Sequence, residues 1–438
     1  MTKLHKKIAT AVSAAAILMQ ATLPVFAQTT TLTITGNGAS SDNDVVVTQV
    51  TTTQVVQNNV ANISNDVDAD ADTGNNDANM NTGGSVLIGT GDAKTTVGIS
   101  NEANSNVADI NGCCAVNASV EISENGYDSD NDAVLTTVSD TQVYQKNYAY
   151  IKNDVDADSD TGKNDANMNT GGDVSILTGS ATTKVLIANK ANSNLAQIGS
   201  GAGGNGSVSL KILGNGAKTD NDIILTLQRS LLLTQDNLAD IRNKVDADSD
   251  TGHNDANMNT GGDVLIGTGN AKTIVGIDNM ANFNSADLNC GCLLDVVAKI
   301  AGNGYDTDNT IVATLLDTKA VFQSNAYVCG GYGYPWVGQY ESWFPWYDGY
   351  KKNCNDVDAD SDTGHNDAEK NTGPVEIDPV MIGTGDATTE VAVSTTANAN
   401  VLTEGTGFDF PQIPELEWDF DFGFNWAFLW AWLVGMGS

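Results

Sequence analysis

Polar and apolar positions alternate with a period of two over long stretches of this chain. Between positions 133 and 157 the odd positions hold Ala, Leu, Val and Ile together with Thr, Ser, Gln and Asn, and the even positions hold mostly Asp, Lys, Gln and Tyr. Such alternation predicts β-strands with one buried and one solvated face. The run is several times longer than the usual strand of about five or six residues, so we expect it to bend. Thr73-Gly74, Thr82-Gly83 and Thr90-Gly91 provide corners, since glycine permits a positive φ.

The same pattern recurs four times. An Asn-Gly turn begins at Asn37, Asn125, Asn215 and Asn303, with spacings of 88, 90 and 88 residues. Each turn leads through an aspartate-rich segment, first seen as NDVDADADTGNNDANMNTGG at Asn65. The chain therefore divides into a leader at 1–27, repeat units at 28–117, 118–206, 207–294 and 295–402, an insertion at 330–353 inside the fourth unit, and a tail at 403–438.

The buried positions of the second unit include Gln145, Asn147 and Asn153. Buried amides need hydrogen-bond partners, and stacked copies of one strand provide them as Asn and Gln ladders. We therefore predict an all-β fold, a repeat β-solenoid in which each unit forms several rungs of short strands. The alternative is a row of β-sandwich domains. Pro, Trp and large core residues are nearly absent from the units, which favours the solenoid, because a sandwich core needs bulk.

The N-terminal segment indicates where the protein is located, and its net charge indicates which partners it does not bind. Lys3, Lys6 and Lys7 precede an apolar run that ends with Val25 and Ala27 at a small-residue cleavage site, which is typical of a secretory signal peptide. We expect a secreted protein, extracellular or on a cell surface. The net charge of -35 repels nucleic acid and attracts cations, so we expect no nucleic-acid partner.

The aspartate-rich segments resemble a calcium loop of the D-x-D-x-D type. The glycine comes one place too late for an EF-hand, and no glutamate occupies the twelfth position, which excludes that motif. Three interpretations stay open: calcium sites at the corners, diffuse screening by cations, and an uncompensated solvated face. Alternate side chains of one strand lie about 7 Å apart, whereas stacked strands bring like charges to about 5 Å, where cations relieve their repulsion. The calcium hypothesis assigns Asp68, Asp70, Asp72, Asn76, Asp77, Asp156, Asp158, Asp160, Asn164, Asp165, Asp246, Asp248, Asp250, Asn254, Asp255, Asp358, Asp360, Asp362, Asn366 and Asp367.

The cysteines fit an oxidising compartment. Cys329 and Cys354 bracket the insertion, so we predict a disulfide between them. Cys113, Cys114, Cys290 and Cys292 lie at unit junctions, where they pair across units, pair locally or bind metal. Zinc is the weaker interpretation, because His253 and His365 lie in aspartate corners rather than beside cysteines.

Aromatic residues are concentrated in the insertion and the tail. Two interpretations of the insertion stay open, a ligand-binding cluster for a surface glycan or protein and a self-contained hydrophobic core. The ligand-binding interpretation uses Tyr332, Tyr334, Trp336, Tyr340, Trp343, Phe344, Trp346 and Tyr347. The apolar run at 422–436 is shorter than the ~20 residues of a membrane-spanning helix. It therefore contacts a membrane interface, docks a subunit or caps the last rung.

The subpattern Gln57-x-Asn59-x-Ala61 returns in the second and third units and is similar to part of a curlin repeat. The fourth unit has Tyr327 in place of the alanine, and the glycine and closing glutamine of curlin repeats are missing. More broadly, residues 30–402 resemble Asn-, Asp- and Gly-rich repeats of secreted bacterial surface proteins, including those of candidate phyla. The resemblance implies a structural surface or fibre role with self-assembly and carries over no catalytic residue.

No G-x-S-x-G, H-E-x-x-H or phosphate-loop motif is present, so we expect no enzyme. The sequence predicts a secreted structural or adhesive repeat protein of a cell surface or fibre, stabilised by calcium. The alternative is a carbohydrate-binding, less favourably a carbohydrate-processing, surface protein that uses the insertion.

Overall fold

The computed structural model describes residues 20–24, 28–111, 116–199, 207–288, 295–329, 354–373 and 380–403. These residues form strands, turns and irregular segments in four sheets, so the fold is all-β. One sheet contains β1 (Gln20–Pro24), β5 (Ala93–Asn111), β9 (Ala181–Ile198), β13 (Ala271–Leu288) and β18 (Ala387–Thr403). The second contains β2 (Gln28–Thr35), β6 (Val116–Ser123), β10 (Ser207–Leu213) and β14 (Asp295–Ala301). The third contains β3 (Asp42–Asp72), β7 (Asp130–Asp160), β11 (Asp220–Asp250), β15 (Asp308–Val328) and β16 (Asn355–Asp362), and the fourth contains β4 (Val86–Gly89), β8 (Val174–Leu177), β12 (Val264–Gly267) and β17 (Val380–Gly383).

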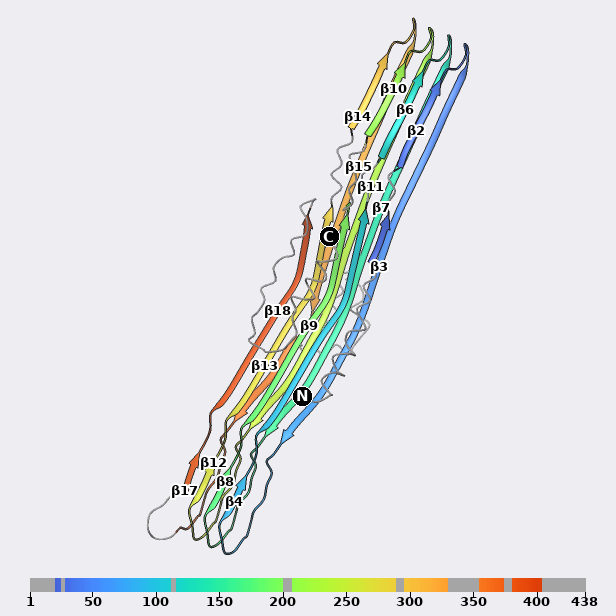
Figure 1. Ribbon diagram of the computed structural model, residues 1–438. Coiled ribbons are helices and arrows are strands. Elements are labelled where there is room, and N and C mark those ends of the chain that lie inside the picture. The colour runs from blue at the N-terminus through green and yellow to red at the C-terminus, as the bar shows by residue number, and fades with distance from the viewer. Residues whose placement is uncertain are drawn as a thin grey trace, which may run out of the picture. The chain divides into compact units, whose positions relative to one another are not determined.

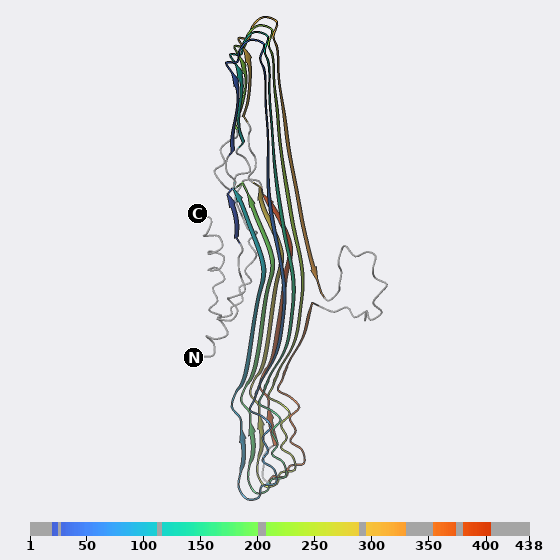
Figure 2. The same ribbon diagram turned by 90° about the vertical axis from the view of Figure 1, so that its right-hand side faces the viewer.

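Each repeat unit forms one long coil of a parallel β-solenoid. In the first coil, β2 leads to the Asn-Gly turn, β3 returns over 31 residues, and a corner segment with β4 leads into β5 (Figure 1). The second coil, β6–β9, repeats this path beside the first, and β10–β13 and β14–β18 follow in the same way (Figure 2). Neighbouring strands of every sheet therefore come from successive units.

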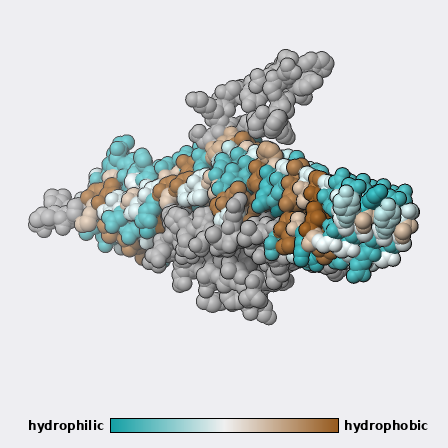
Figure 3. Space-filling view, turned by 90° about the horizontal axis from the view of Figure 1, so that it is seen from above, coloured by the Kyte–Doolittle hydropathy of each residue, from teal (hydrophilic) through white to brown (hydrophobic). Residues whose placement is uncertain are grey.

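The strands pair in parallel and in register, so equivalent residues stand side by side. Asn59 of β3 lies beside Asn147 of β7, which lies beside Asn237 of β11 and then Asn325 of β15. The insertion interrupts this register without shifting it, because β16 resumes the pairing with Asn355 beside Asn243. The stacking of like on like produces alternating hydrophilic and hydrophobic bands across the described surface (Figure 3).

Two details of the predicted fold were wrong. A unit forms a single coil rather than several rungs, and β3, β7 and β11 each continue for 31 residues without breaking into short strands. The physical reason is that each long strand has an equally long copy beside it, which pairs the backbone N–H and C=O groups facing that copy along the whole length. Tandem sandwiches are excluded by the same topology, because each sheet is shared by all four units.

A thin core lies between two layers of strands. At one end, Leu135 and Leu225 of the third sheet pack against Val120 and Leu210 of the second. Farther along, the third sheet packs against the sheet of β5, β9 and β13 through residues such as Val155 and Val185. Along β7 the burial alternates as the sequence predicted, with the odd positions facing inward.

The prediction that corner glycines supply a positive φ is confirmed at Gly83 (77°), Gly171 (109°) and Gly261 (110°), but it is wrong for the corner that directly follows each long strand. Gly74, Gly162, Gly252 and Gly364 do not have a positive φ; the residue after each of them does, at Asn75 (57°), Lys163 (56°), His253 (55°) and His365 (56°). A Cβ on Gly162 would lie 2.0 Å from the carbonyl oxygen of Gly252 on the next coil. These corners need glycine because the coils approach closely there, not because of backbone conformation.

The strand β1 lies inside the predicted signal peptide and pairs with Val107–Asn111 of β5. Cleavage after Ala27 would remove it and begin the first coil at β2. In the described part of the chain, no helix has the length and apolar character needed to cross a membrane.

Candidate functional site

In-register stacking places the aspartates of successive coils in rows on the outer face. Asp68, Asp156, Asp246 and Asp358 form one row, and Asp70, Asp158, Asp248 and Asp360 form a second. Short bridges align a third row of Asp77, Asp165, Asp255 and Asp367. Neighbouring strands in a sheet are about 4.8 Å apart, so each row brings like charges close together across coils.

Burial and the stacking of like charges raise the pKa of several aspartates in these rows. Burial, followed by the charges of Asp158, Asp246 and Asp360, raises the pKa of Asp248 from 3.8 to about 6. Burial and the neighbouring carboxylates, Asp156 first among them, also raise the pKa of Asp158. The pKa of Asp165 is raised by burial and then by Asp255 and Asp77. These shifts show that the folded chain holds carboxylates where ionisation is unfavourable.

At the Thr-Gly corner that directly follows the third sheet in each coil, one aspartate closes the turn. Asp72, Asp160, Asp250 and Asp362 accept a hydrogen bond from the N–H of the following glycine, at 2.7, 2.7, 2.6 and 2.6 Å. The side chain three residues after each aspartate, which is Asn75, Lys163, His253 or His365, also contacts its carboxylate. The motif Asp-Thr-Gly-X was readable in the sequence, but its role as a turn was missed because the aspartate was assigned to a metal.

The asparagines of the predicted corner sites face the interior. The Nδ2 of Asn76 donates to Oδ1 of Asn164 at 2.9 Å, and the ladder continues through Asn254 (2.8 Å) and Asn366 (2.7 Å). Each of these amides also donates to the threonine carbonyl oxygen of its own corner, as Asn76 does to Thr73 at 2.9 Å. The corner asparagines are thus engaged in the core, away from the aspartate rows.

The structure brings predicted ligands together across coils rather than within one loop. Among the described His, Cys, Asp and Glu residues, the only group of three or more whose ligand atoms lie within 4.8 Å of one another is His253, Asp362 and His365. The aspartates of one segment, such as Asp68, Asp70 and Asp72, do not form such a group. Each of them instead belongs to its own row of equivalent aspartates, which runs along the stacking direction from coil to coil.

Amide ladders fill the core between the two layers. Gln145 donates to Gln57 and accepts from Gln235, both at 2.8 Å, and Asn153 donates to Asn243 at 2.6 Å. Sequence reasoning predicted these two columns and that of Asn147, but missed the facing columns of Asn101, Asn189 and Asn279 and of Asn106, Asn194, Asn284 and Asn400. The recurring N-x-x-N-x-N spacing at 101–106 carried that signal.

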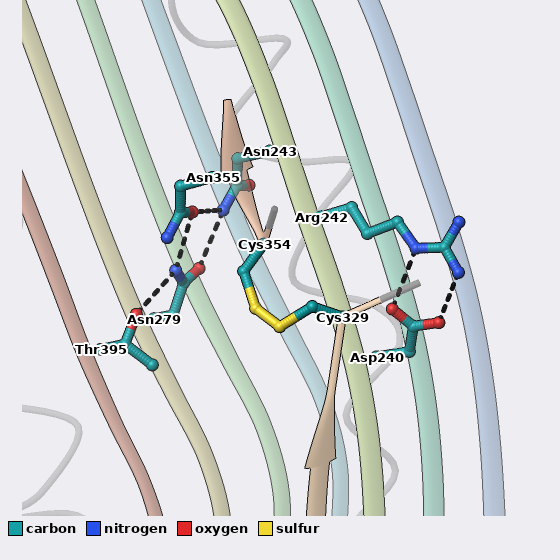
Figure 4. Close-up of a disulfide and its surroundings, with 8 residues drawn as sticks. All are labelled: Asp240, Arg242, Asn243, Asn279, Cys329, Cys354, Asn355 and Thr395. Atoms are coloured by element: carbon teal, nitrogen blue, oxygen red, sulfur yellow. Dashed lines mark hydrogen bonds and ion pairs between the residues drawn. A yellow bond between two sulfur atoms is a disulfide. The ribbon is translucent and has the colours of Figure 1, made fainter. Parts of the chain in front are cut away.

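The predicted disulfide is present. Cys329, after β15, is bonded to Cys354, before β16, with Cα atoms 4.8 Å apart (Figure 4). Beside it, Asn243 donates to Asn355 at 2.7 Å and to Asn279 at 3.1 Å. The bridge therefore closes the insertion at its base and returns the chain to the ladder register.

Several predicted residues lie outside the described part of the chain. These are the aromatic residues of the insertion from Tyr332 to Tyr347, the cysteines Cys113, Cys114, Cys290 and Cys292, and the apolar run at 422–436.

Comparisons with protein-family models, curated proteins and solved structures found no match to this chain.

Proposed function

We propose that this protein is a secreted structural or adhesive element of a cell surface or fibre. The observation that carries the proposal is the in-register stacking of four long coils whose inward amides form continuous columns, such as Gln57, Gln145, Gln235 and Gln323. A core of this kind restricts shear between coils, because sliding one coil by one residue breaks every ladder and turns every side chain to the other face.

Chemistry on the outer face also favours a structural role over catalysis. The acidic rows repeat the same residue in each coil, whereas hydrolysis by a carboxylate pair needs one distinct acid and one distinct base. The disulfide Cys329–Cys354 and the leader with its basic start fit an extracellular location.

One experiment tests both the extracellular location and the elongated or fibrous form of the protein. The full gene with an epitope tag at an exposed loop is expressed in a secreting host, intact cells are treated with protease, and the mature protein is imaged by electron microscopy. We expect loss of the tag on intact cells and elongated particles or fibres. Retention of protease-resistant protein inside the cells, with compact particles only, would contradict the proposal.

We further propose that cations, calcium among them, stabilise the acidic face. The raised pKa values of Asp158, Asp165 and Asp248 support this, because a bound cation relieves the same repulsion that a proton relieves. Thermal melting in chelator and in millimolar calcium, with sodium chloride of matched ionic strength as the control, measures the effect. An increase in Tm that sodium reproduces identifies screening, and one specific to calcium identifies sites.

A second candidate function is recognition of a glycan or protein by the aromatic insertion. The observation that favours it is that the Cys329–Cys354 bridge joins the two ends of the insertion and β16 resumes pairing with β11 in register. Deletion of residues 330–353 makes Cys329 and Cys354 consecutive, where side chains in a strand point to opposite faces, so both are changed to serine in this variant. A second variant with the insertion aromatics changed to serine keeps the loop length and the disulfide. We expect both to lose binding to a glycan array. Undiminished binding by both would remove this function.

A further inference from the structure

Two histidines of successive coils stack at the outer corner that follows the third sheet. The rings of His253 and His365 lie 4.8 Å apart between centroids, with 10° between their planes. Both side chains are exposed, at 46% and 71% of their full area. In the other two coils the equivalent positions hold Asn75 and Lys163, so this pair occurs at one junction only, between the third and fourth coils.

Carboxylates hold both rings in place. The Nδ1 of His253 is 3.1 Å from Oδ2 of Asp250, and the Nδ1 of His365 is 2.9 Å from Oδ2 of Asp362. Asp362 belongs to both parts of the cluster, because one of its oxygens and one nitrogen from each ring all lie within 4.8 Å of one another. A carboxylate on one imidazole nitrogen orients the ring so that its other nitrogen can bind a metal, and Asp250 is placed on Nδ1 of His253 in this way.

We propose that His253, His365 and Asp362 form a binding site for a divalent transition-metal ion such as Zn²⁺, Ni²⁺ or Cu²⁺. Imidazole nitrogens suit these ions, whereas calcium takes oxygen ligands. The 2.9 Å between Nδ1 of His365 and Oδ2 of Asp362 is the separation of two neighbouring ligand atoms at about 90° on one ion with bonds of about 2.0–2.2 Å, as in octahedral or square-planar coordination. The ion would take the place of the hydrogen bond between these two atoms. The exposed rings close the remaining gap by side-chain rotation, and water completes the coordination.

The position explains what the ion does for the fold. The strand β16 has eight residues, pairs with β11 on the third coil, and follows the insertion. The disulfide at Cys354 holds its beginning, and Asp362 is its last residue. An ion shared by Asp362, His365 and His253 therefore fastens the other end of β16 to the third coil.

The repeat provides a variant that removes a ligand and keeps the corner. In the first coil Asn75 has a φ of 57° and donates to Asp72 at 2.8 Å, so the substitution His365→Asn reproduces a corner that the chain already uses. The substitution His253→Asn does the same on the third coil. The matched control is Lys163→Asn, the same change at the second coil, which removes none of the three proposed ligands.

The experiment titrates tag-free mature protein with Zn²⁺ by calorimetry, in excess calcium to occupy the aspartate rows, and measures Tm with and without zinc. We expect one tight site per chain and a zinc-dependent rise in Tm in the parent and in Lys163→Asn. In His365→Asn and His253→Asn we expect affinity to fall roughly tenfold or more. Electron paramagnetic resonance of the Cu²⁺ form should show coupling to two imidazole nitrogens in the parent and one in either variant. Equal zinc affinity in the parent and both histidine variants, no tight site in the parent, or a Cu²⁺ spectrum with oxygen ligands only would overturn the assignment.

Discussion

The Nδ2 of Asn147 on β7 donates a hydrogen bond of 2.8 Å to Oδ1 of Asn194 on the facing strand β9. Asn147 is fully buried and also donates to Asn237 on the next coil, at 3.0 Å, while it accepts from Asn59 on the previous coil, at 3.0 Å. One amide thus links two layers and three coils. Its donors and acceptor are satisfied without water, which is how a core rich in asparagine avoids the cost of buried polar groups.

Replacement of this amide should destabilise the protein strongly. The substitution Asn147→Ala removes one hydrogen-bond partner from each of the amides of Asn59, Asn194 and Asn237. We expect the free energy of unfolding to fall by about 2–4 kcal/mol, since each such hydrogen bond contributes about 0.5–1.5 kcal/mol. Urea unfolding measures the loss. Asn58→Ala, on the exposed face of β3, is the control and should change stability by less than about 0.5 kcal/mol. Equal effects of the two substitutions would contradict the role of the ladder.

Replacement of glycine at the close contacts between coils should destabilise the protein, except in the first coil, where an added Cβ on Gly91 meets no neighbouring coil. A Cβ on Gly179 would lie 2.3 Å from the carbonyl oxygen of Gly91, whereas a Cβ on Gly91 would meet nothing within 4 Å. We expect Gly179→Ala to cost about 1–3 kcal/mol or more through overpacking and Gly91→Ala to be tolerated. Thermal melting compares the two. A similar loss in both variants would show that backbone flexibility, rather than contact, sets the requirement.

Mild acid should stabilise the protein. Burial and neighbouring carboxylates raise the pKa of Asp248 from 3.8 to about 6, so the folded chain binds more protons than the unfolded chain between about pH 4 and 6. The free energy of unfolding therefore rises as the pH falls through this window, and Tm measured from pH 7 to pH 4.5 should increase.

Two single aspartate variants test this pH effect, because we expect them to change Tm at pH 7 in opposite directions. The substitution Asp248→Asn should raise Tm at pH 7 and reduce the gain on acidification. Asp317→Asn should lower Tm at pH 7, because a hydrogen bond from Arg229 holds the pKa of Asp317 below its usual range. A Tm that falls steadily from pH 7 to pH 4.5 would contradict the prediction.

The disulfide should matter locally for β16. It closes a separation of 25 residues, and loop entropy of this size contributes about 3–4 kcal/mol. We expect Cys329→Ser with Cys354→Ser to accelerate amide hydrogen exchange at Asn355–Asp362, while exchange in the middle of β7 stays slow because both its neighbours remain in place. Unchanged exchange in β16 would show that pairing with β11 alone suffices to hold it.

Much of the fold followed from local pattern. The period of two, the four Asn-Gly turns and the inward Gln145, Asn147 and Asn153 were enough to predict a stacked all-β solenoid, because the alternation and the inward amides are properties of each unit by itself. The Cys329–Cys354 pairing followed from its position around the insertion. Coil length did not follow, because whether an alternating run bends depends on the copy that lies beside it.

The sequence by itself determined which face of each strand is buried, where the units repeat and which residues stand in equivalent positions. Only the tertiary structure decided that one unit makes one coil and that His253 lies against His365. These relationships join residues about 90 to 112 positions apart, as the ladder contacts of Asn164 with Asn254 and of Asn254 with Asn366 do. The physical reason is that spacing along a chain fixes the direction of a side chain, whereas its neighbours across a sheet are fixed by register.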